Sequence, residues 1–351
     1  MSMLFFDGFD GYDSVFDAET YGGWYNIATS VNRIALVTGR TGTGKGFNFS
    51  ATVDYNWADV YTPDQSGKTL YIGFAFKDSN VTGVSGNVLN FTQTTAANTP
   101  QALVYYDAVD KVLQLRLGNG TVLATSSMSM VYNSWYYVEV KYLCHNTTGV
   151  FELRVNESVV ASYTGDTQYQ STDSVVMFKF CDCNIVSTLT HPAAHSIDDI
   201  YILNSDGATN NTYLGDVQCT MLAPSADYST TFTPTGAVSN YLCVDEAVGA
   251  PDNDTTYVSS STVGAVDEYS IPNIVASSVH AVKVNTRAMK DDVNPRNMKH
   301  GIRTGTNANE VEYVLGENYG NYIDVFDDQG DGTPWDETSF NAARSMIKVQ
   351  S

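Results

Sequence analysis

Short runs of apolar and aromatic residues alternate with polar turn segments along almost the whole chain. The run Trp-Tyr-Tyr-Val-Glu-Val-Lys-Tyr at residues 135–142 places alternate side chains on opposite sides, as a half-buried strand does. Turn sequences such as Asn119-Gly120 separate the runs. Further strands are predicted at residues 4–6, 48–53, 69–76, 101–106, 112–117, 150–155, 158–163, 174–180 and 196–203. So many short strands, with no convincing helix among them, predict an all-β sandwich or barrel of the jelly-roll kind.

The pattern is interrupted after Leu203 by a polar, glycine-containing stretch. We therefore predict a first domain at residues 1–204, a linker at 205–212, and a second, smaller β-sandwich domain at 213–351. In that second domain, strands are expected at residues 213–222, 279–286, 297–303, 310–315 and 346–349, whereas 240–270 is loop-like. One short helix is expected over residues 339–345, with Thr338 or Ser339 as its cap.

Composition and charge exclude several classes of protein. The chain of 351 residues has 18 Lys plus Arg against 39 Asp plus Glu, a formal net charge of -21, which repels phosphate backbones and argues against a nucleic-acid partner. Hydrophobic residues make up 43% of the chain, enough for real cores and too many for global disorder. No apolar run is long enough for a membrane span, and residues 1–7 do not resemble a secretory signal, so no membrane insertion is expected. An odd number of cysteines at irregular spacing favours reduced thiols and a protein made in a cytoplasm; they are Cys144, Cys181, Cys183, Cys219 and Cys243.

Several motifs together resemble a known family. The segment Phe-Asp-Gly-Phe-Asp at residues 6–10, followed by Trp24 and Gly-Arg-Thr-Gly at 39–42, resembles the start of a concanavalin A/laminin G-like jelly roll. Residues 135–141 and the Ile-Asp-Asp-Ile-Tyr run at 197–201 strengthen that resemblance. The second half resembles segments of tailed-bacteriophage virion proteins at residues 215–222, 232–234, 240–246 and 256–261.

The resemblance implies a structural protein of a tailed-phage particle, located on the tail, a fibre or the capsid surface and assembled in the host cytoplasm. Its implied partners are other virion proteins and copies of itself in a homo-oligomer. The alternative is a carbohydrate-binding adhesin module that recognises a host-surface glycan. We expect no enzymatic activity, since neither a facing carboxylate pair nor a nucleophile with its base can be placed in the sequence.

Four aspartates give the one candidate metal site. Laminin G-like sandwiches place their first and last strands side by side, which would bring Asp7 and Asp10 close to Asp198 and Asp199. Crowded carboxylates are costly unless a cation or water separates them, so a structural Ca²⁺ is the predicted cofactor. In the alternative, Asp198 and Asp199 straddle the sheet, one exposed and the other bonded to backbone amides. No other cofactor is expected.

Three further motifs favour a structural interpretation. The Gly-rich run at residues 39–45 nearly spells a phosphate-binding loop, but Gly46 stands where Ser or Thr is required, so a hairpin turn is expected. Residues 327–332 begin like a calcium loop, but Thr338 stands at the twelfth position in place of the required Glu. The Cys-x-Cys pair at 181 and 183 has poor spacing for zinc, which favours an edge strand leading into a loop.

Overall fold

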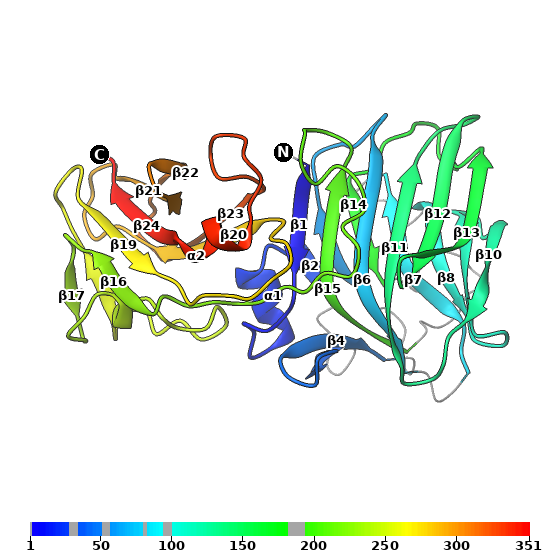
Figure 1. Cartoon of the computed structure of the whole chain (residues 1–351), viewed down its shortest axis with the longest axis horizontal. Helices are drawn as coiled ribbons and strands as arrows, with labels where there is room; N and C mark the ends of the chain where they lie inside the picture. Colours follow the sequence, from blue (N-terminus) through cyan, green and yellow to red (C-terminus); the bar gives the residue numbers. More distant parts are fainter. Residues whose placement is uncertain (1, 28–33, 51–56, 80–82, 94–99, 182–193) are drawn as a thin grey trace. The chain divides into compact units, whose positions relative to one another are not determined.

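Nearly all the regular structure of this protein is β-strand, in a computed structural model that describes residues 2–27, 34–50, 57–79, 83–93, 100–181 and 194–351. The described chain divides into two compact units, Ser2–Thr220 and Met221–Ser351 (Figure 1). The prediction of an all-β protein with an N-terminal jelly-roll sandwich is confirmed. No helix within these described ranges is long and apolar enough to cross a membrane.

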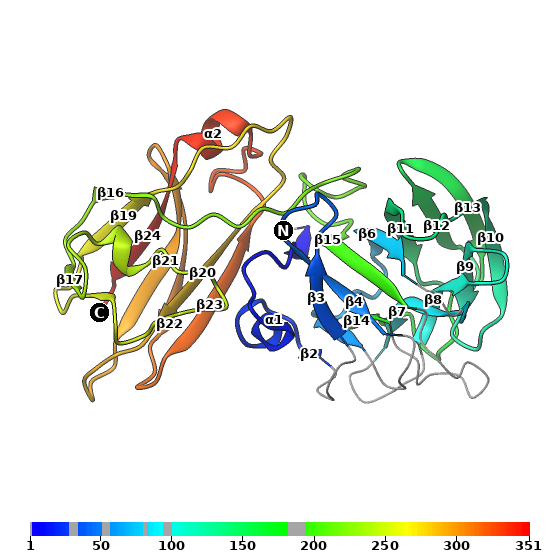
Figure 2. The same cartoon turned by 90° about the horizontal axis from the view of Figure 1, so that it is seen from below.

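The N-terminal unit consists of two antiparallel sheets that lie face to face (Figure 2). In the described residues, the eight-stranded sheet has the order β13 (Ser158–Gly165), β12 (Gly149–Val155), β11 (Trp135–Leu143), β6 (Thr69–Asp78), β15 (His195–Asn204), β4 (Lys45–Phe49) and β3 (Ile34–Thr38), and β1 (Met3–Asp7) also pairs with β15. The seven-stranded sheet has the order β10 (Val122–Ser129), β9 (Val112–Leu117), β8 (Pro100–Asp107), β7 (Gly86–Thr92), β14 (Met177–Phe180), β5 (Ala58–Tyr61) and β2 (Asn26–Ile27).

Aromatic side chains fill the space between these two sheets. Phe91 of β7 contacts Tyr142 of β11, with ring centroids 4.5 Å apart. Phe74 of β6 meets the edge of Phe180 of β14 at 5.7 Å. These contacts join opposite sheets, and each of the four rings is buried. The alternating strands therefore bury one face each in a shared core, which accounts for most of the sandwich's stability.

One helix interrupts the strands of the N-terminal unit. Helix α1 (Val15–Tyr21) begins after Ser14, whose backbone N–H donates to the Asp17 carboxylate at 2.7 Å. Such a Ser-x-x-Asp start satisfies backbone donors that the first turn leaves without helical partners. The sequence analysis did not predict this helix, because a run of seven residues is too short to show helical periodicity.

The C-terminal unit is a smaller β-sandwich. Its described strands form a five-stranded sheet in the order β16 (Ala226–Ser229), β19 (Val266–Ser270), β24 (Ala343–Val349), β21 (Asn297–Thr304) and β22 (Asn307–Val314), together with the pairs β17 (Thr233–Thr235) with β18 (Tyr257–Ser259) and β20 (Val282–Ala288) with β23 (Gly320–Phe326). A 3₁₀ turn, η1, covers Tyr241–Cys243, and α2 covers Glu337–Asn341. The core cluster contains Ile302, Phe326, Trp335, Phe340 and Ala343.

A buried histidine joins the two layers of this C-terminal unit. The ring of His300 on β21 lies with Nδ1 2.9 Å from the Thr286 hydroxyl of β20 and Nε2 2.6 Å from the Asp324 carboxylate of β23. Tyr313 donates to the same carboxylate at 2.8 Å. Burial lowers the pKa of His300, although Asp324 opposes that shift. Because both ring nitrogens and the carboxylate have partners, the group acts as a polar clamp between the sheets.

The chain departs from the predicted organisation at the domain boundary. Residues 213–222, expected as the first strand of the second domain, form no strand, and residues 213–220 belong to the N-terminal unit, which ends at Thr220. Their bonds to that unit, described below, are the physical reason. The predicted helix at 339–345 is shorter and begins earlier, because Asp336 rather than Thr338 or Ser339 caps α2 and accepts from the Ser339 N–H at 2.7 Å.

Candidate functional site

The predicted neighbourhood of the first and last strands of the sandwich is present. β1 pairs with β15, and Asp7 lies opposite Ile200. The Asp7 carboxylate accepts hydrogen bonds from the Tyr12 hydroxyl at 2.6 Å and the Trp24 indole N–H at 2.8 Å. Because Tyr12 precedes α1 and Trp24 follows it, these two hydrogen bonds to Asp7 hold the loop and helix after β1 against the strand.

The other three predicted metal ligands are also bonded by protein donors. Asp10 accepts from the Lys45 N–H at 2.8 Å, and Asp198 accepts from the Arg40 N–H at 2.9 Å. Asp199 accepts from the Cys219 N–H at 2.7 Å and pairs with the Arg40 side chain. Burial raises the pKa of Asp198 to about 7, and the neighbouring Asp199 adds to the shift.

Each of the four aspartates thus has partners within the chain, and the calcium hypothesis stays a prediction. Among the described residues, no group of three or more His, Cys, Asp or Glu side chains is arranged to hold a metal ion. The alternative of one exposed and one bonded aspartate also needs correction, because Asp198 and Asp199 are both buried and both accept from backbone amides. The cluster serves to attach the loop after β3 and the segment after β15 to the sandwich.

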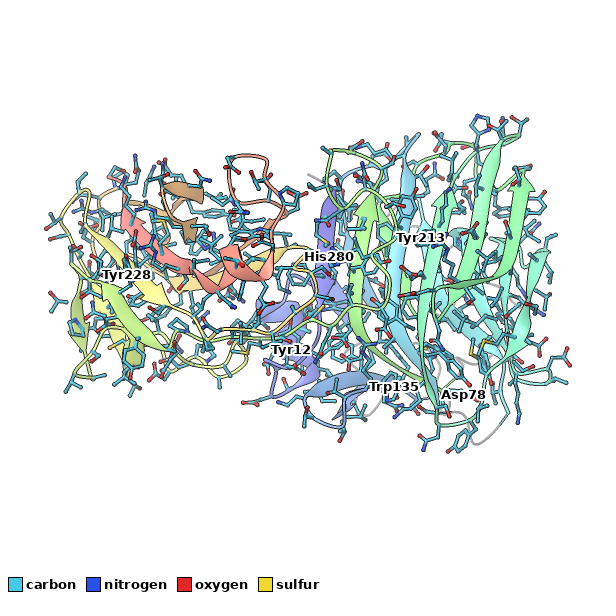
Figure 3. The ribbon with its side chains drawn as sticks, in the orientation of Figure 1. Tyr12, Asp78, Trp135, Tyr213, Tyr228 and His280 are labelled. Carbon is cyan, nitrogen blue, oxygen red and sulfur yellow. The ribbon has the colours of Figure 1, made fainter. Side chains whose placement is uncertain are left out.

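A segment of the chain covers the outer face of the eight-stranded sheet. We call residues 213–219 the covering segment. The Leu214 N–H donates to the Tyr201 hydroxyl at 3.2 Å, and the Gly215 N–H donates to the Glu139 carboxylate at 2.9 Å. The Tyr213 ring, labelled in Figure 3, packs edge-on against Tyr71 of β6, with ring centroids 5.1 Å apart. The Tyr201 hydroxyl and one oxygen of Glu139 thus receive partners from within the chain, while Glu139 Oε2 has none among the described residues.

Arg40 fastens the far end of the covering segment. Its guanidinium bonds to Asp199 on β15, to Asp216 and to the backbone carbonyl of Val217. The Asp199 side chain is only 3% exposed, so the arginine compensates a buried charge. Arg40 also lies 5.0 Å from the centre of the Tyr137 ring on β11.

The outer face of the seven-stranded sheet is different. On β14, Phe178 and Phe180 point into the sandwich, where they contact Phe91 at 5.9 Å and Phe74 at 5.7 Å. Because side chains alternate along a strand, Lys179 between them points to the outer face. This lysine is nevertheless only 6% exposed.

The strand register places Lys179 in a line of residues that crosses the sheet. Lys179 lies opposite Asp59 of β5 on one side and Asn90 of β7 on the other, and the line continues through Leu103 of β8 to Arg116 of β9. We call these five residues the cross-strand row. Neighbouring strands are about 4.8 Å apart, so the row extends roughly 19 Å from Asp59 to Arg116.

One end of the row carries an ion pair. The Lys179 ammonium lies 3.6 Å from the Asp59 carboxylate, and both side chains are buried. The same ammonium lies 5.5 Å from the centre of the Trp57 ring. The Asp59 carboxylate and the face of the Trp57 ring are thus both within reach of the Lys179 ammonium.

The centre of the row holds a buried amide. Asn90 is 0% exposed, and neither its amide nitrogen nor its oxygen has a hydrogen-bond partner among the described residues. The Thr92 hydroxyl lies two residues further along β7 on the same face, and it too is buried without a hydrogen-bond partner among the described residues. A buried polar group without a partner costs about 1–3 kcal/mol, so a structure that retains one usually has a use for it.

The other end of the row carries a stacked arginine. The Arg116 guanidinium lies 3.6 Å from the centre of the Tyr105 ring, and its Nε donates to the Gln114 side chain at 2.8 Å. Burial raises the pKa of Tyr105, although Arg116 opposes the shift, so the phenol is protonated at neutral pH. Burial lowers the pKa of Arg116, which nonetheless stays charged.

The remaining predicted motifs lie away from this row. Residues 39–44 form the turn between β3 and β4, as the hairpin interpretation predicted. Residues 327–332 lie in the turn between β23 and α2. The cysteines of the described chain are Cys144, Cys181, Cys219 and Cys243, while Cys183 and His191 of the rejected zinc motif lie outside the described residues.

The sequence analysis missed the residues of the row. β7 was not predicted, because Asn87 and Asn90 interrupt its apolar run. The available signal was a charged residue within an aromatic strand, Phe178-Lys179-Phe180, together with Gln114 and Arg116 alternating with leucines. Polar positions of that kind identify an outer face, but only the register shows that they line up.

Comparison with known proteins yields likeness in architecture alone. No family model matches the chain, and no curated protein matches it. Solved structures that are similar include an endo-β-1,4-glucuronan lyase from the fungus Trichoderma reesei, with 13% identity, a TM-score of 0.39 and coverage of 54% of this chain and 97% of that one. An alginate lyase in complex with alginate trisaccharide has 11% identity, a TM-score of 0.42 and coverage of 57% and 98%. A Trypanosoma rangeli sialidase has 10% identity, a TM-score of 0.34 and coverage of 50% and 29%.

These neighbours correct one prediction. The glucuronan lyase, the alginate lyase and the sialidase are all enzymes, and on this finding the prediction that the chain is not an enzyme is wrong. At such identities and TM-scores, the likeness assigns neither a substrate nor a mechanism. The role in a phage particle and the virion partners stay predictions.

Proposed function

We propose that the Ser2–Thr220 unit is a carbohydrate-active enzyme that binds a polysaccharide along the cross-strand row. The observation that carries this proposal is the buried Asn90 amide, which has no partner among the described residues and lies beside the Lys179 cation. An amide and an ammonium in line offer hydrogen bonds to sugar hydroxyl and carboxylate oxygens. A row of roughly 19 Å suits an extended chain better than a single small molecule. Asp59, Lys179 and Asn90 are at most 6% exposed, so a polysaccharide must displace what covers this face in order to bind them.

The charges of the row favour an acidic polysaccharide. Lys179 and Arg116 place two cations on this face of a chain whose formal net charge is -21. A carboxylate-bearing sugar can bind there because the local cations offset the general repulsion.

The same groups favour eliminative cleavage over hydrolysis. A sugar carboxylate held by Asn90 and Lys179 would lose part of its negative charge, which makes the adjacent C–H bond more acidic. A water molecule would take that proton as the bond to the glycosidic oxygen breaks and a C=C bond forms. The protonated Tyr105 would donate its proton to the leaving oxygen and regain one from the hydronium ion. Hydrolysis requires two facing carboxyl groups, whereas Asp59, the carboxylate of the row, is paired with Lys179.

Titration of the full chain with polysaccharides tests this proposal. We expect binding of alginate or glucuronan but not of uncharged dextran, and an unsaturated sugar end that absorbs ultraviolet light. Lys179→Met should weaken binding by about tenfold or more, since it removes a buried charge-assisted contact. Lys141→Met is the matched control, because Lys141 lies on the eight-stranded sheet beside Tyr71. Equal binding by wild type and Lys179→Met, or no binding of any acidic polymer, would overturn the proposal.

A further inference from the structure

Two tyrosine rings lie side by side near one end of the cross-strand row. Tyr25, next to β2, and Tyr61, the last residue of β5, are 52% and 50% exposed. Their ring centroids are 5.5 Å apart with the planes tilted by 37°. The large aromatic side chains of the sandwich interior are, by contrast, fully buried. This pair therefore presents aromatic surface to solvent that the core does not use.

The backbone fixes the pair next to the Asp59 end of the row. Tyr61 follows Asp59 by two residues on β5, so both side chains point to the outer face. Tyr61 also lies opposite Met177, two residues before Lys179 on β14. The Tyr25 N–H donates to the Asp59 carbonyl at 2.8 Å, which fixes Tyr25 to the same strand.

We propose that Tyr25 and Tyr61 form an outer sugar subsite, in which a ring of a bound polysaccharide stacks on the tyrosines beyond the Asp59 end of the row. The apolar C–H face of a sugar packs on an aromatic ring, and the phenol hydroxyls remain free to bond sugar oxygens. A tyrosine side chain loses little conformational entropy when it forms such a contact, because only a few of its bonds rotate. This inference rests on the proposed function and adds a direction: the sugar chain runs from Arg116, across the row, to the β2–β5 edge.

Chain length is the property that such a subsite changes. An oligosaccharide that occupies only the row gains nothing from the tyrosines. A longer one reaches the pair and gains a further contact without losing the first. Affinity should therefore rise with length in the wild-type protein, and Tyr61→Ala should remove that rise.

The experiment measures binding of alginate oligosaccharides of graded length to the full chain. For the longest ones, Tyr61→Ala and Tyr25→Ala should each weaken binding about fivefold to tenfold, and for the shortest that bind, less than about twofold. Tyr61→Phe keeps the ring and should stay within about twofold of wild type. Tyr132→Ala is the matched control, because Tyr132 is 46% exposed and follows β10, the strand at the opposite edge of the sheet.

The outcomes separate this inference from the proposed function. Length-dependent loss in the Tyr25 and Tyr61 variants, with Tyr132→Ala unchanged, supports the subsite. Equal affinity of the alanine variants and wild type at every length overturns the subsite, while a loss in Lys179→Met still upholds the row. If wild type binds no oligosaccharide of any length, both the subsite and the proposed function fail.

Discussion

The two outer faces of the N-terminal sandwich differ in how many partners the chain itself supplies to their buried polar groups. On the eight-stranded sheet, the covering segment supplies donors to Glu139 and Asp199, and Arg40 ties that segment down. On the seven-stranded sheet, the Asn90 amide and the Thr92 hydroxyl are buried with no partner among the described residues. On the first face the chain supplies partners for one oxygen of Glu139 and leaves Oε2 without one among the described residues, whereas on the second face both polar atoms of the Asn90 amide lack a partner.

This difference explains why we place a ligand on the seven-stranded sheet. A face whose polar groups are satisfied gains little from a ligand, since each new hydrogen bond replaces an existing one. A face with an amide lacking a partner gains a bond without losing another. The acidic residues of the first face therefore bind backbone and side-chain donors of this chain, and the calcium site predicted from them stays a prediction.

The largest expected effect comes from breaking the covered face at Arg40. Arg40→Met removes the cationic partner of Asp199, whose side chain is 3% exposed, and leaves this buried carboxylate with the Cys219 N–H as a donor. Loss of one partner of a buried pair costs about 3–5 kcal/mol. Denaturant unfolding of the full chain measures this loss.

The control for Arg40 is an exposed pair of the same kind. Lys68 and Asp206 form an ion pair in which both side chains are at least one-third exposed. Lys68→Met should change the free energy of unfolding by about 1 kcal/mol or less, because solvent screens the pair. Equal effects of the two substitutions would refute the structural role assigned to Arg40.

A smaller effect is expected from pH on the same covered face. Burial raises the pKa of Asp198 to about 7, whereas in the unfolded chain it is near 3.8. The folded state thus holds a proton that the unfolded chain releases, so this stability is present at low pH and is lost as pH rises through about 7. Asp10 and Asp199 have pKa values raised by burial and add in the same direction.

Asp198→Asn isolates that contribution. Between about pH 5 and about pH 7, the wild type should lose on the order of 2 kcal/mol relative to this variant. Unfolding curves of both proteins at several pH values measure the difference. Parallel pH profiles for the two proteins would mean that Asp198 ionises normally in the folded state.

Much of the sandwich was predictable from alternation alone. The strand expected at residues 112–117 coincides with β9, and the run at 135–142 matches β11 to within one residue. In both strands apolar and polar residues alternate regularly, and a clear turn sequence precedes or follows the strand. The covering segment was misassigned as a strand, because its apolar residues pack on a sheet without joining a ladder, and sequence alone does not separate these cases.

The candidate site was harder to predict than the fold. Asp7, Asp10, Asp198 and Asp199 stood out because carboxylates recur near the predicted first and last strands, yet each already has protein donors. The cross-strand row draws its residues from five strands, and bulges shift the register within the β7–β8 pair. A line of that kind depends on pairing between distant segments, which local sequence patterns do not encode.

The smallest change in stability is expected for Asn90→Leu, and this variant tests the role of the cross-strand row. Asn90→Leu replaces the buried amide by an apolar side chain of similar size, which removes polar atoms that lack partners among the described residues. The variant should be as stable as wild type or about 1 kcal/mol more stable, because no satisfied hydrogen bond is lost.

Paired measurement of unfolding free energy and alginate binding for Asn90→Leu tests the central claim most directly. The account predicts unchanged or increased stability together with binding weakened by about tenfold or more. A variant that loses about 2 kcal/mol or more of stability but binds alginate as wild type does would contradict it, since Asn90 would then serve the fold and not a ligand.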